Sequence, residues 1–472
     1  MPSILAIDQG TTSTKAYRSD GAGEVVLVGN RSHRQIRPHP GWVEHDAGEL
    51  LGNIRALLDA AGPVDLVGLA NQGETVIAWD AQTGLPLGNA IVWQDDRTSA
   101  VTAKLRDDGH EALCLERSGL PLDPYFSATK LRWLLDHRAD AQKLRQEGRL
   151  RLGTSDAYFI AALTGLYATD VSTASRTGLM DLKTRCWDPE LCALFGVPVE
   201  CLPAIRPSLG DFGLLPDGAR LVASAVDQQA SLYGHDCQNP GDIKITFGTG
   251  AFVLGLTGAR PVMDNGVGLL PTVAWQLGDA PTQYALDGGI LTAGSALEWL
   301  REIGLLDDFT LLDAAGTGTG SAAARGLFFI PAQGGLGCPY WDRTARGGWI
   351  GIGLDTPRAD LTRAVVEGIA LRAAQIVDAF ASAAAVGRVS IDGGLSQSRY
   401  FCQFLADVLN REISVADSSD LTALGMLRLC AASLAAPLNL PSRWRRITPQ
   451  PGDRSTIRAK FGVAVERMRG WA

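Results

Sequence analysis

The amino-acid sequence predicts an α/β protein with more than one domain. Short apolar segments of strand character alternate along the chain with segments of helical periodicity, which is typical of this class. At 472 residues the chain exceeds the length that a single hydrophobic core usually supports, so two or three domains are expected. The strand-and-turn pattern of the N-terminus also recurs near residue 237, which indicates a two-fold repeat.

The first half of the chain begins with a predicted strand over Ile4 to Ile7, a Gly/Thr/Ser turn and a second strand from Lys15. Asp46 is predicted to cap a helix that runs to about Ala61, because Gly62 follows as a C-terminal stop. Further strands are predicted over 64–70, 75–79 and 221–226, and a helix over 125–137.

In the second half, a strand from Ile243 runs into the turn Phe247-Gly-Thr-Gly250 and is followed by a strand over 251–256. Another strand begins at Val389 and ends in two glycines. The turn-forming segment around 230–242 is the predicted domain boundary, which divides the chain into domains 1–236 and 237–472. The segment 316–326, GTGTGSAAARG, is predicted to be a loop.

Charge and composition exclude several classes of function. The net charge is −8 and no basic run is longer than WRRI, which argues against nucleic acid and anionic membranes as partners. Neither a membrane-spanning segment nor a signal peptide is recognisable, so a cytoplasmic protein is expected. The eight cysteines include no CxxC pair, which favours buried thiols over a metal or disulfide framework.

Three Gly/Thr turns follow predicted strands and have the chemistry of a phosphate site. The first is Asp8-Gln-Gly-Thr-Thr-Ser-Thr-Lys15, the second is Phe247-Gly-Thr-Gly250, and the third is Asp392-Gly-Gly394. Glycine lets the backbone approach an anion, and consecutive N–H groups and hydroxyls can point towards it. Asp8 can hold Mg²⁺ through water, and Lys15 adds a positive charge. Because no GxxxxGK[ST] occurs, a P-loop fold is disfavoured.

A further polar cluster, Asp227-Gln228-Gln229, follows the apolar strand over 221–226. A hydroxyl that attacks phosphorus needs its proton removed and its oxygen oriented, and one carboxylate can do both. Taken alone, Asp227 is better explained as a capping or salt-bridging residue. Its closeness in sequence to the second phosphate turn favours a catalytic role.

Together these segments form a pattern that resembles the FGGY family of carbohydrate kinases, and within it most closely the glycerol kinases. The resemblance covers nearly the whole chain in family order. The matching segments are IDQGTTS at Asp8, PGWVEHD (40–46), NQGET (71–75), NAIVWQDDRT (89–98), LDPYFSATK (122–130), SAVDQQA (224–230), FGTGAF (247–252), GLGCPYWD (335–342), GGWIGIGLDTPRADLTRAVVEGI (347–369) and TALG (422–425).

The resemblance implies two actin-like, hexokinase-like (ribonuclease H-like) domains around a central cleft that holds ATP and a small polyol or sugar. It implies Asp227 as general base and Asp8 as the residue that organises Mg²⁺. The implied nucleotide and phosphate positions are Gly10, Thr11, Thr12, Ser13, Lys15, Gly248, Thr249, Gly294, Glu298, Gly394 and Ser398. The implied acceptor-binding positions are Glu74, Trp93, Tyr125, Asp227, Gln228 and Phe252. A homodimer is also compatible with the family.

The chain departs from the glycerol kinase pattern at several positions. The family's NQRET is NQGET here, so Gly73 replaces an arginine that grips a substrate hydroxyl. This loss predicts a four- or five-carbon acceptor instead of glycerol, unless an arginine from elsewhere in the chain substitutes. Lys15 replaces an arginine, which keeps the positive charge but loses the fork of donors. Glu298 replaces a glutamine and Ser398 an asparagine at nucleotide-contacting positions, which weakens the expectation of adenine selectivity. The segment before Asp227 also lacks the loop linked to fructose bisphosphate inhibition.

Two other classes of function remain as alternatives to a polyol or sugar kinase. A non-catalytic ATP-binding module is possible on the same fold, although such a module has no need of the acceptor base Asp227. A dinucleotide-dependent oxidoreductase is suggested only by the α/β class and by 54 glycines. The first predicted strand is not followed by GxGxxG, which disfavours that reading.

Overall fold

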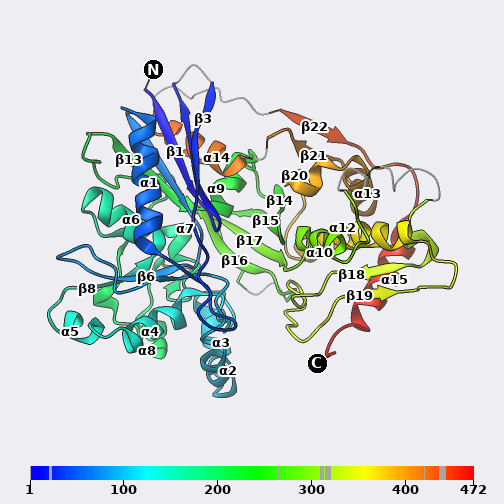
Figure 1. The fold of residues 1–472 in the computed structure, drawn as a ribbon, viewed down its shortest axis with the longest axis horizontal. Coiled ribbons are helices and arrows are strands. Elements are labelled where there is room, and N and C mark those ends of the chain that lie inside the picture. Colours follow the sequence, from blue (N-terminus) through cyan, green and yellow to red (C-terminus); the bar gives the residue numbers. More distant parts are fainter. Residues whose placement is uncertain are drawn as a thin grey trace.

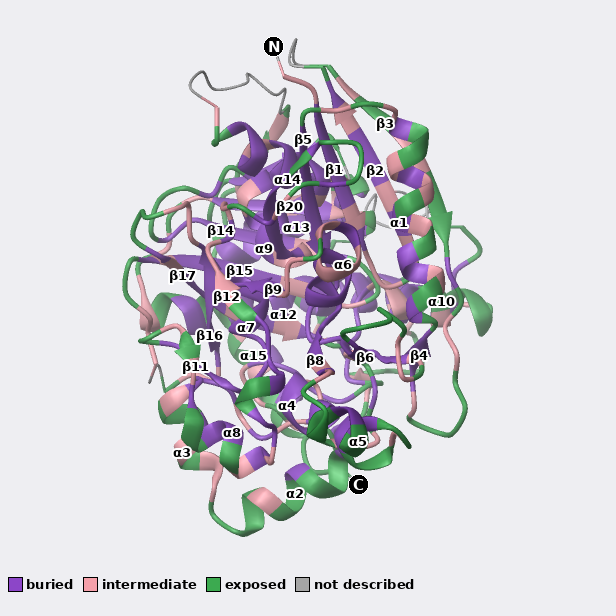
Figure 2. Ribbon diagram, turned by 90° about the vertical axis from the view of Figure 1, so that its left-hand side faces the viewer, coloured by how far each residue is buried: buried purple, intermediate pink, exposed green. Residues whose placement is uncertain are grey.

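The computed structural model describes residues 2–20, 24–263, 266–308, 313, 320–418, 420–434 and 443–471. Figure 1 shows two α/β halves side by side, each built on a twisted sheet with helices on its faces. The predicted α/β class and the two-domain arrangement are therefore confirmed. Buried residues lie mainly in the sheets and on the inner faces of the helices (Figure 2).

The first half contains a five-stranded sheet with the strand order β13-β5-β1-β2-β3. β1 pairs antiparallel with β2 and parallel with β5, and β5 pairs parallel with β13. The five strands are β1 (Ile4–Gln9), β2 (Ser13–Ser19), β3 (Val25–Ser32), β5 (Leu66–Asn71) and β13 (Arg220–Val226). β1 is longer than predicted and β2 begins two residues earlier, because the turn at Gly10 closes with a 3.0 Å hydrogen bond from its N–H to the carbonyl of Ser13.

Helix α1 (Ala47–Ala61) covers one face of this sheet and has the predicted ends. The carboxylate of Asp46 accepts hydrogen bonds from the N–H groups of Gly48 and Glu49 at 2.8 and 3.1 Å, and so satisfies two backbone donors of the first turn. Gly62 ends the helix at φ 65°, a conformation that favours glycine. The apolar face of α1 packs in the core beneath the sheet.

The rest of the first half surrounds a four-stranded sheet with the order β4-β7-β6-β8 and two small strand pairs. The predicted strand over 75–79 corresponds to β6, and the predicted helix over 125–137 corresponds to α4. The remaining elements are β4 (Glu44–His45), β6 (Val76–Asp80), β7 (Ala90–Ile91), α2 (Ser99–Asp107), α3 (Glu111–Arg117), α4 (Ser127–His137), α5 (Ala141–Gln146), β8 (Leu150–Thr154), α6 (Ser155–Thr164), β9 (Ala168–Asp170), α7 (Val171–Ala174), β10 (Met180–Asp181), β11 (Cys186–Trp187), α8 (Pro189–Phe195), η1 (Val199–Cys201), β12 (Ala204–Arg206) and α9 (Asp227–Gly234).

The second half contains a seven-stranded sheet with the order β16-β17-β15-β14-β20-β21-β22. As in the first sheet, an antiparallel hairpin, β14 with β15, is followed by parallel neighbours, β20 and β21. The predicted two-fold repeat thus agrees with the observed strand order. The strands are β14 (Ile243–Phe247), β15 (Ala251–Gly258), β16 (Leu270–Trp275), β17 (Gln283–Ile290), β20 (Val389–Gly393), β21 (Ile413–Ala416) and β22 (Trp444–Ile447).

Helix α12 is the central helix of the second half and packs against its sheet in the largest hydrophobic core. The helices and small strands of this half are α10 (Gly294–Glu302), η2 (Ala323–Arg325), β18 (Phe328–Ile330), β19 (Gly348–Ile350), α12 (Arg358–Ala383), η3 (Gly394–Gln397), α13 (Arg399–Leu409), α14 (Leu421–Ala431) and α15 (Ser455–Glu466). Of the loop predicted over 316–326, residues 316–319 lie outside the described residues, and the remainder contains η2.

Helix α14 comes late in the chain but packs on the sheet of the first half, next to α9 (Figure 1). Its Met426 and Cys430 lie against Gly68 of β5, where a Cβ atom would stand 2.6 Å from the Cys430 sulfur. Helices α9 and α14 approach so closely that a Cβ on Gly425 would lie 1.8 Å from the carbonyl oxygen of Ala230. This close contact ties the two halves together immediately behind Asp227.

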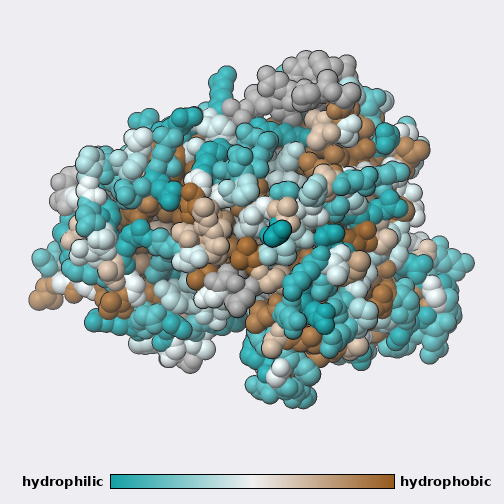
Figure 3. Space-filling model, turned by 180° about the vertical axis from the view of Figure 1, so that it is seen from behind, coloured by the Kyte–Doolittle hydropathy of each residue, from teal (hydrophilic) through white to brown (hydrophobic). Residues whose placement is uncertain are grey.

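The surface seen in Figure 3 mixes hydrophilic and hydrophobic groups, and its apolar side chains form small separate groups. Within the described ranges, every helix is too short or too polar to cross a membrane. The domain boundary at 236/237 and the homodimer stay predictions.

Substitution of Gly425 by alanine is expected to destabilise the protein by about 3 kcal/mol or more, because the new methyl group overlaps the α9 backbone and forces the helices apart. The free energy of unfolding, measured by urea denaturation, tests this expectation.

Gly462→Ala is the matched control, since Gly462 lies inside α15 and a Cβ there meets no atom within 4 Å. Alanine is the better helix former, so this variant should gain up to about 1 kcal/mol. Equal stability of the two variants would show that α9 and α14 can separate without penalty.

Candidate active site

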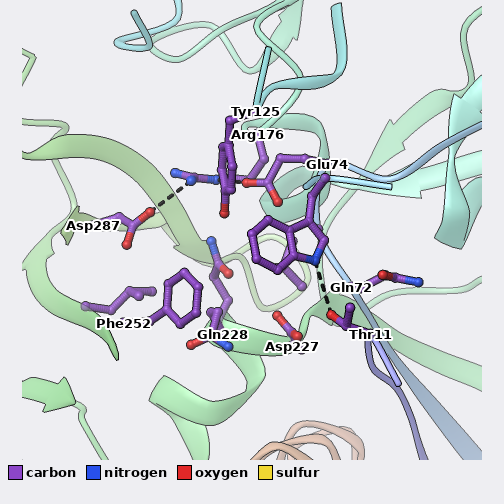
Figure 4. Close-up of a pocket in the computed structure, with 14 residues that line it drawn as sticks. Thr11, Gln72, Glu74, Tyr125, Arg176, Asp227, Gln228, Phe252 and Asp287 are labelled. Carbon is purple, nitrogen blue, oxygen red and sulfur yellow. Dashed lines mark hydrogen bonds and ion pairs between the residues drawn. The ribbon is translucent and has the colours of Figure 1, made fainter. Parts of the chain in front are cut away.

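A cavity of about 110 Å³ lies where the two halves meet, and side chains from both halves point into it (Figure 4). Of the six predicted acceptor-binding residues, Glu74, Trp93 and Tyr125 lie in loops of the first half, Asp227 and Gln228 begin helix α9, and Phe252 comes from β15 of the second half. The fourteen lining residues are Thr11, Gln72, Gly73, Glu74, Trp93, Tyr125, Arg176, Val226, Asp227, Gln228, Gln229, Phe252, Leu254 and Asp287. All six acceptor residues predicted from the sequence therefore line one cavity.

Asp227 is the first residue of α9 and directly follows the buried strand β13. Burial raises the pKa of its carboxyl to about 7, and the negative charge of Asp8 acts in the same direction. The ammonium of Lys244 opposes both effects. A carboxyl group that titrates near neutral pH is suited to accept a proton from a hydroxyl.

Three aromatic rings form the apolar wall of the cavity. The ring of Trp93 meets Tyr125 and Phe252 edge-on, with centroid distances of 5.6 and 6.4 Å. The Trp93 indole N–H donates a 3.1 Å hydrogen bond to the hydroxyl of Thr11, so this wall is fixed to the first phosphate turn. Aromatic faces of this kind cover the C–H edges of a carbon chain.

Glu74 is buried and adopts a left-handed backbone conformation with φ 56°. This conformation is unfavourable for a residue with a side chain, and it turns the carboxylate into the cavity (Figure 4). Burial raises the pKa of Glu74, although the nearby guanidinium of Arg176 opposes the shift. Gly73 precedes Glu74 in this tight turn, where the N–H of Thr75 bonds the carbonyl of Gly73 at 2.7 Å.

Arg176 and Asp287 also line the cavity and were not predicted from the sequence. The Arg176 Nε donates to Glu74 at 2.7 Å, and its Nη2 lies 2.8 Å from a carboxylate oxygen of Asp287 on β17. Arg176 is thus an arginine from elsewhere in the chain that lies beside Glu74, and its substitution for the arginine lost at position 73 stays a prediction. Asp287 had a recognisable signal, because it is a lone charge in an apolar strand, whereas nothing in the sequence around Arg176 distinguishes it.

Lys244, another lone charge in an apolar strand, is fully buried beneath the cavity. Its ammonium bonds the side-chain oxygen of Gln228 and lies 3.1 Å from the hydroxyl of Thr246. The lysine therefore orients Gln228, and its charge favours the ionised form of Asp227. Burial lowers the pKa of Lys244 itself, while the carboxylates of Asp392 and Asp227 oppose that change.

The first phosphate turn lies between β1 and β2, beside the cavity. Thr11 lines the cavity, and Gly10 forms the turn described above. Lys15 makes a 3.0 Å ion pair with Asp420, which precedes α14. Burial raises the pKa of Asp8 to about 6, with Lys15 acting against the shift and Asp420 adding to it. Thr12 and Ser13 complete the turn, so this part of the predicted phosphate site is contiguous.

The second and third glycine turns are adjacent, because β14 and β20 are parallel neighbours. The backbone N–H of Gly294 donates to the carbonyl of Gly248 at 2.9 Å, which joins the start of α10 to the second turn. The N–H groups of residues 293 and 295 both bond the carbonyl of Thr249. A Cβ on Gly294 would lie 2.5 Å from the Gly248 oxygen, while the space beside Gly394 is open.

Two predicted nucleotide contacts have clear structural partners. Glu298 is an exposed residue of α10 that pairs with Arg301 at 2.6 Å. Ser398 caps α13 by accepting a hydrogen bond from the N–H of Phe401, and its hydroxyl donates to Asp313 at 2.7 Å. Their roles in binding a nucleotide stay predictions.

Asp8 can hold Mg²⁺ only through water. Its charge interacts with those of Asp227 and Asp420, and Mg²⁺ prefers oxygen ligands and keeps much of its water shell. Among the described residues, no three or more His, Cys, Asp or Glu side chains cluster so that they could hold the ion directly. Burial is the main cause of the raised pKa values of Asp8 and Asp227, and a neighbouring carboxylate adds to each shift; a divalent cation bound nearby would oppose both.

Comparison with known proteins identifies the family of this chain. The family models of the FGGY family of carbohydrate kinases match residues 3–226 (N-terminal domain) and 243–434 (C-terminal domain). The chain belongs to the FGGY family of carbohydrate kinases. It is 41% identical to a glycerol kinase of Alkalilimnicola ehrlichii, over 100% of this chain and 99% of that one. It is also 41% identical to a glycerol kinase of Thermus brockianus, with the same two coverages.

Among solved structures, this FGGY kinase resembles Plasmodium falciparum glycerol kinase with ADP, with a TM-score of 0.92 and 31% identity. The match covers 99% of this chain and 98% of that chain. The protein is therefore an ATP-dependent kinase of sugars or polyols, a phosphotransferase with an alcohol group as acceptor.

The rate of this FGGY kinase is expected to fall below about pH 7, because Asp227, as the base predicted from the sequence, would have to be ionised to accept a proton. Removing the nearby positive charge in Lys244→Met should move this fall in kcat/KM to higher pH. The pH profile of kcat/KM for the acceptor measures both effects. The exposed Lys104→Met is the control and should retain the wild-type profile; a profile unchanged in Lys244→Met would contradict the assigned charge interaction.

Asp227→Asn is expected to abolish turnover, to leave ATP binding nearly intact, and to stabilise the protein at pH 8. The folded-state pKa lies above the ordinary value of 3.8, so the penalty for the buried charge is absent below about pH 4 and complete above about pH 7. The gain in unfolding free energy, of up to a few kcal/mol, should therefore shrink as the pH falls from 8 to 4.

Assays of turnover, ATP titrations and melting curves across this pH range test the Asp227→Asn expectations, with the exposed Asp279→Asn as control. Retained activity in Asp227→Asn would refute the role of Asp227 as base.

Proposed function

We propose that this kinase transfers the γ-phosphate of ATP to a hydroxyl of a small polyol or ketose of four or five carbons. The observation that supports this most is the position of Asp227, whose carboxyl has a pKa of about 7 and borders the same cavity as Glu74, Gln228 and three aromatic rings. Thr11 of the first phosphate turn borders that cavity too, so acceptor and phosphate sites adjoin.

In the proposed reaction, Asp227 accepts the proton of the attacking hydroxyl and orients its oxygen towards the phosphate. Glu74 and Gln228 bind further hydroxyls, and Trp93 and Phe252 cover the carbon chain. The phosphates are held by the backbone N–H groups and hydroxyls of the first two turns and by Lys15. Asp8 would hold Mg²⁺ through water, and the ion would neutralise charge on the phosphates. Closure of the halves excludes water and so suppresses hydrolysis of ATP.

The size and lining of the cavity support a small acceptor. Its volume of about 110 Å³ is well below that of pockets for drug-sized ligands, which begin at roughly 300 Å³. Gly73 contributes no side chain, although part of the space beside it is taken by Val226, whose Cγ1 would lie 3.1 Å from a Cβ on Gly73. Beyond Glu74, the cavity offers the charged groups of Arg176 and Asp287, which favour an acceptor with more hydroxyls than glycerol.

Glycerol is the second candidate acceptor. The buried Arg176 approaches Glu74 at 2.7 Å and so compensates in part for the arginine that Gly73 replaces. The relatives that are 41% identical over the whole chain are named glycerol kinases. A cytoplasmic location, in keeping with a small metabolite as substrate, is part of the same proposal.

The proposal is tested by an ADP-release assay with magnesium ATP and a panel of acceptors: glycerol, erythritol, both threitols, xylitol, ribitol, erythrulose and xylulose. A four- or five-carbon acceptor is expected to have the highest kcat/KM, by about 10-fold or more over glycerol, because each lost hydroxyl contact leaves a buried polar group unpaired. A clear preference for glycerol would overturn the four- or five-carbon assignment and establish the second candidate.

A further inference from the structure

The ion pair of Arg176 and Asp287 is only partly satisfied by the protein. The Arg176 guanidinium uses Nε for Glu74 and Nη2 for one oxygen of Asp287, with both distances below 3 Å. Its remaining nitrogen, Nη1, and the other Asp287 oxygen, Oδ1, are buried and have no hydrogen-bond partner among the described residues. Buried polar atoms in native proteins nearly always have partners, so two such atoms on one ion pair require an explanation.

The surroundings of the pair are arranged to hold it rigidly. The side chain of Arg176 is only 4% exposed, and its guanidinium carbon lies 5.9 Å from the ring centre of Tyr125 and 5.5 Å from that of Phe126. Directly before Arg176, the hydroxyl of Ser175 bonds that of Thr272 at 2.9 Å and accepts from the N–H of Val273 at 3.2 Å. The arginine is therefore fixed between the two halves.

The pair and the proposed base lie on opposite sides of the cavity. In Figure 4, Arg176 and Asp287 lie above the ring of Phe252 and the side chain of Gln228, and Asp227 lies below, next to Thr11. Both residues of the pair line the cavity together with Asp227. An acceptor that presents one terminal hydroxyl to Asp227 thus directs its far end towards the pair.

From this geometry we infer that Arg176 and Asp287 bind the acceptor hydroxyl farthest from the transferred phosphate and determine specificity for it. A hydroxyl is both donor and acceptor, so it can donate to Asp287 Oδ1 and accept from Arg176 Nη1. The inference rests on the proposed polyol kinase activity and specifies its substrate as a polyol or ketose with a hydroxyl at the far end. A carboxylate there would face both Glu74 and Asp287, which disfavours sugar acids.

The test compares acceptors that differ only in the far hydroxyl: erythritol with butane-1,2,3-triol, and glycerol with propane-1,2-diol. A site built to bind a hydroxyl strongly rejects the analogue that lacks it. The wild-type kinase is expected to prefer the acceptor that has the far hydroxyl over the analogue that lacks it. In the pair whose acceptor reacts faster, the ratio of the two kcat/KM values should be about 10² or more.

Asp287→Asn is expected to reduce this preference to about 10-fold or less. Because Arg176 Nη2 holds the amide oxygen, the amide nitrogen takes the place of Oδ1 and can no longer accept a hydrogen bond from the hydroxyl. Arg176→Lys, which keeps the positive charge but loses the fork of donors, is the second variant and should have the same effect. Asp279→Asn, the same substitution at an exposed position, is the control.

A purely structural role predicts a different result, because a distorted cavity lowers kcat/KM for both members of a pair and leaves their ratio unchanged. The shift in melting temperature that each acceptor causes provides a second readout without turnover, and it also reports whether each variant folds. Turnover with an unaltered ratio in the folded variants would overturn the inference alone. A panel that neither reacts nor shifts the melting temperature would overturn the proposed function as well.

Discussion

The close contact of α9 with α14 is the constraint on which the catalytic arrangement depends. Neither Gly234 nor Gly425 could carry a side chain there, since a Cβ on either would overlap a backbone carbonyl oxygen of the other helix, at 1.9 and 1.8 Å. α9 begins with Asp227, so the contact fixes the proposed base relative to a helix from the other end of the chain. The same helix is preceded by Asp420, which pairs with Lys15 of the first phosphate turn. The contact between α9 and α14, which only glycine allows, thus positions the proposed base, the first phosphate turn and the two sheets relative to one another.

Around this frame the site concentrates buried charge of both signs. Glu74, Asp227 and Asp287 border the cavity, and Arg176, Lys130 and Lys244 lie among them. Burial disfavours the ionised form of a charged group, and a neighbouring group of opposite charge favours it. The stability of each ionised group here therefore depends on the others. Lys130 illustrates the balance: burial lowers its pKa to about 8, while Glu74 and Asp95 oppose the shift. Such a network keeps the carboxylates positioned before a substrate arrives.

Local features of the fold were predictable because the residues that determine them are close in sequence. Asp46 and Gly62 delimit α1, and apolar runs delimit β14 and β20 as predicted. The residues of the acceptor cavity were predictable through motifs that match a family. Arg176 was not, because its partners Glu74 and Asp287 are distant in sequence and nothing nearby requires an arginine. The packing of α14 on the first sheet could not be predicted either, because the sequence of an apolar helix does not specify which sheet it covers.

The backbone at Glu74 has a consequence for how this pocket could change over evolutionary time. A left-handed conformation costs a residue with a side chain about 1 kcal/mol, and glycine would remove that penalty. Selection for stability alone would therefore favour glycine at position 74, as it occurs at the neighbouring position 73. The presence of a carboxylate at this position in spite of that cost fits a role in ligand recognition. The adjoining Gly73 is under no comparable conformational demand, but a Cβ there would lie 3.1 Å from Val226 Cγ1, so this turn can acquire a new side chain, and with it a new acceptor, only if Val226 shifts.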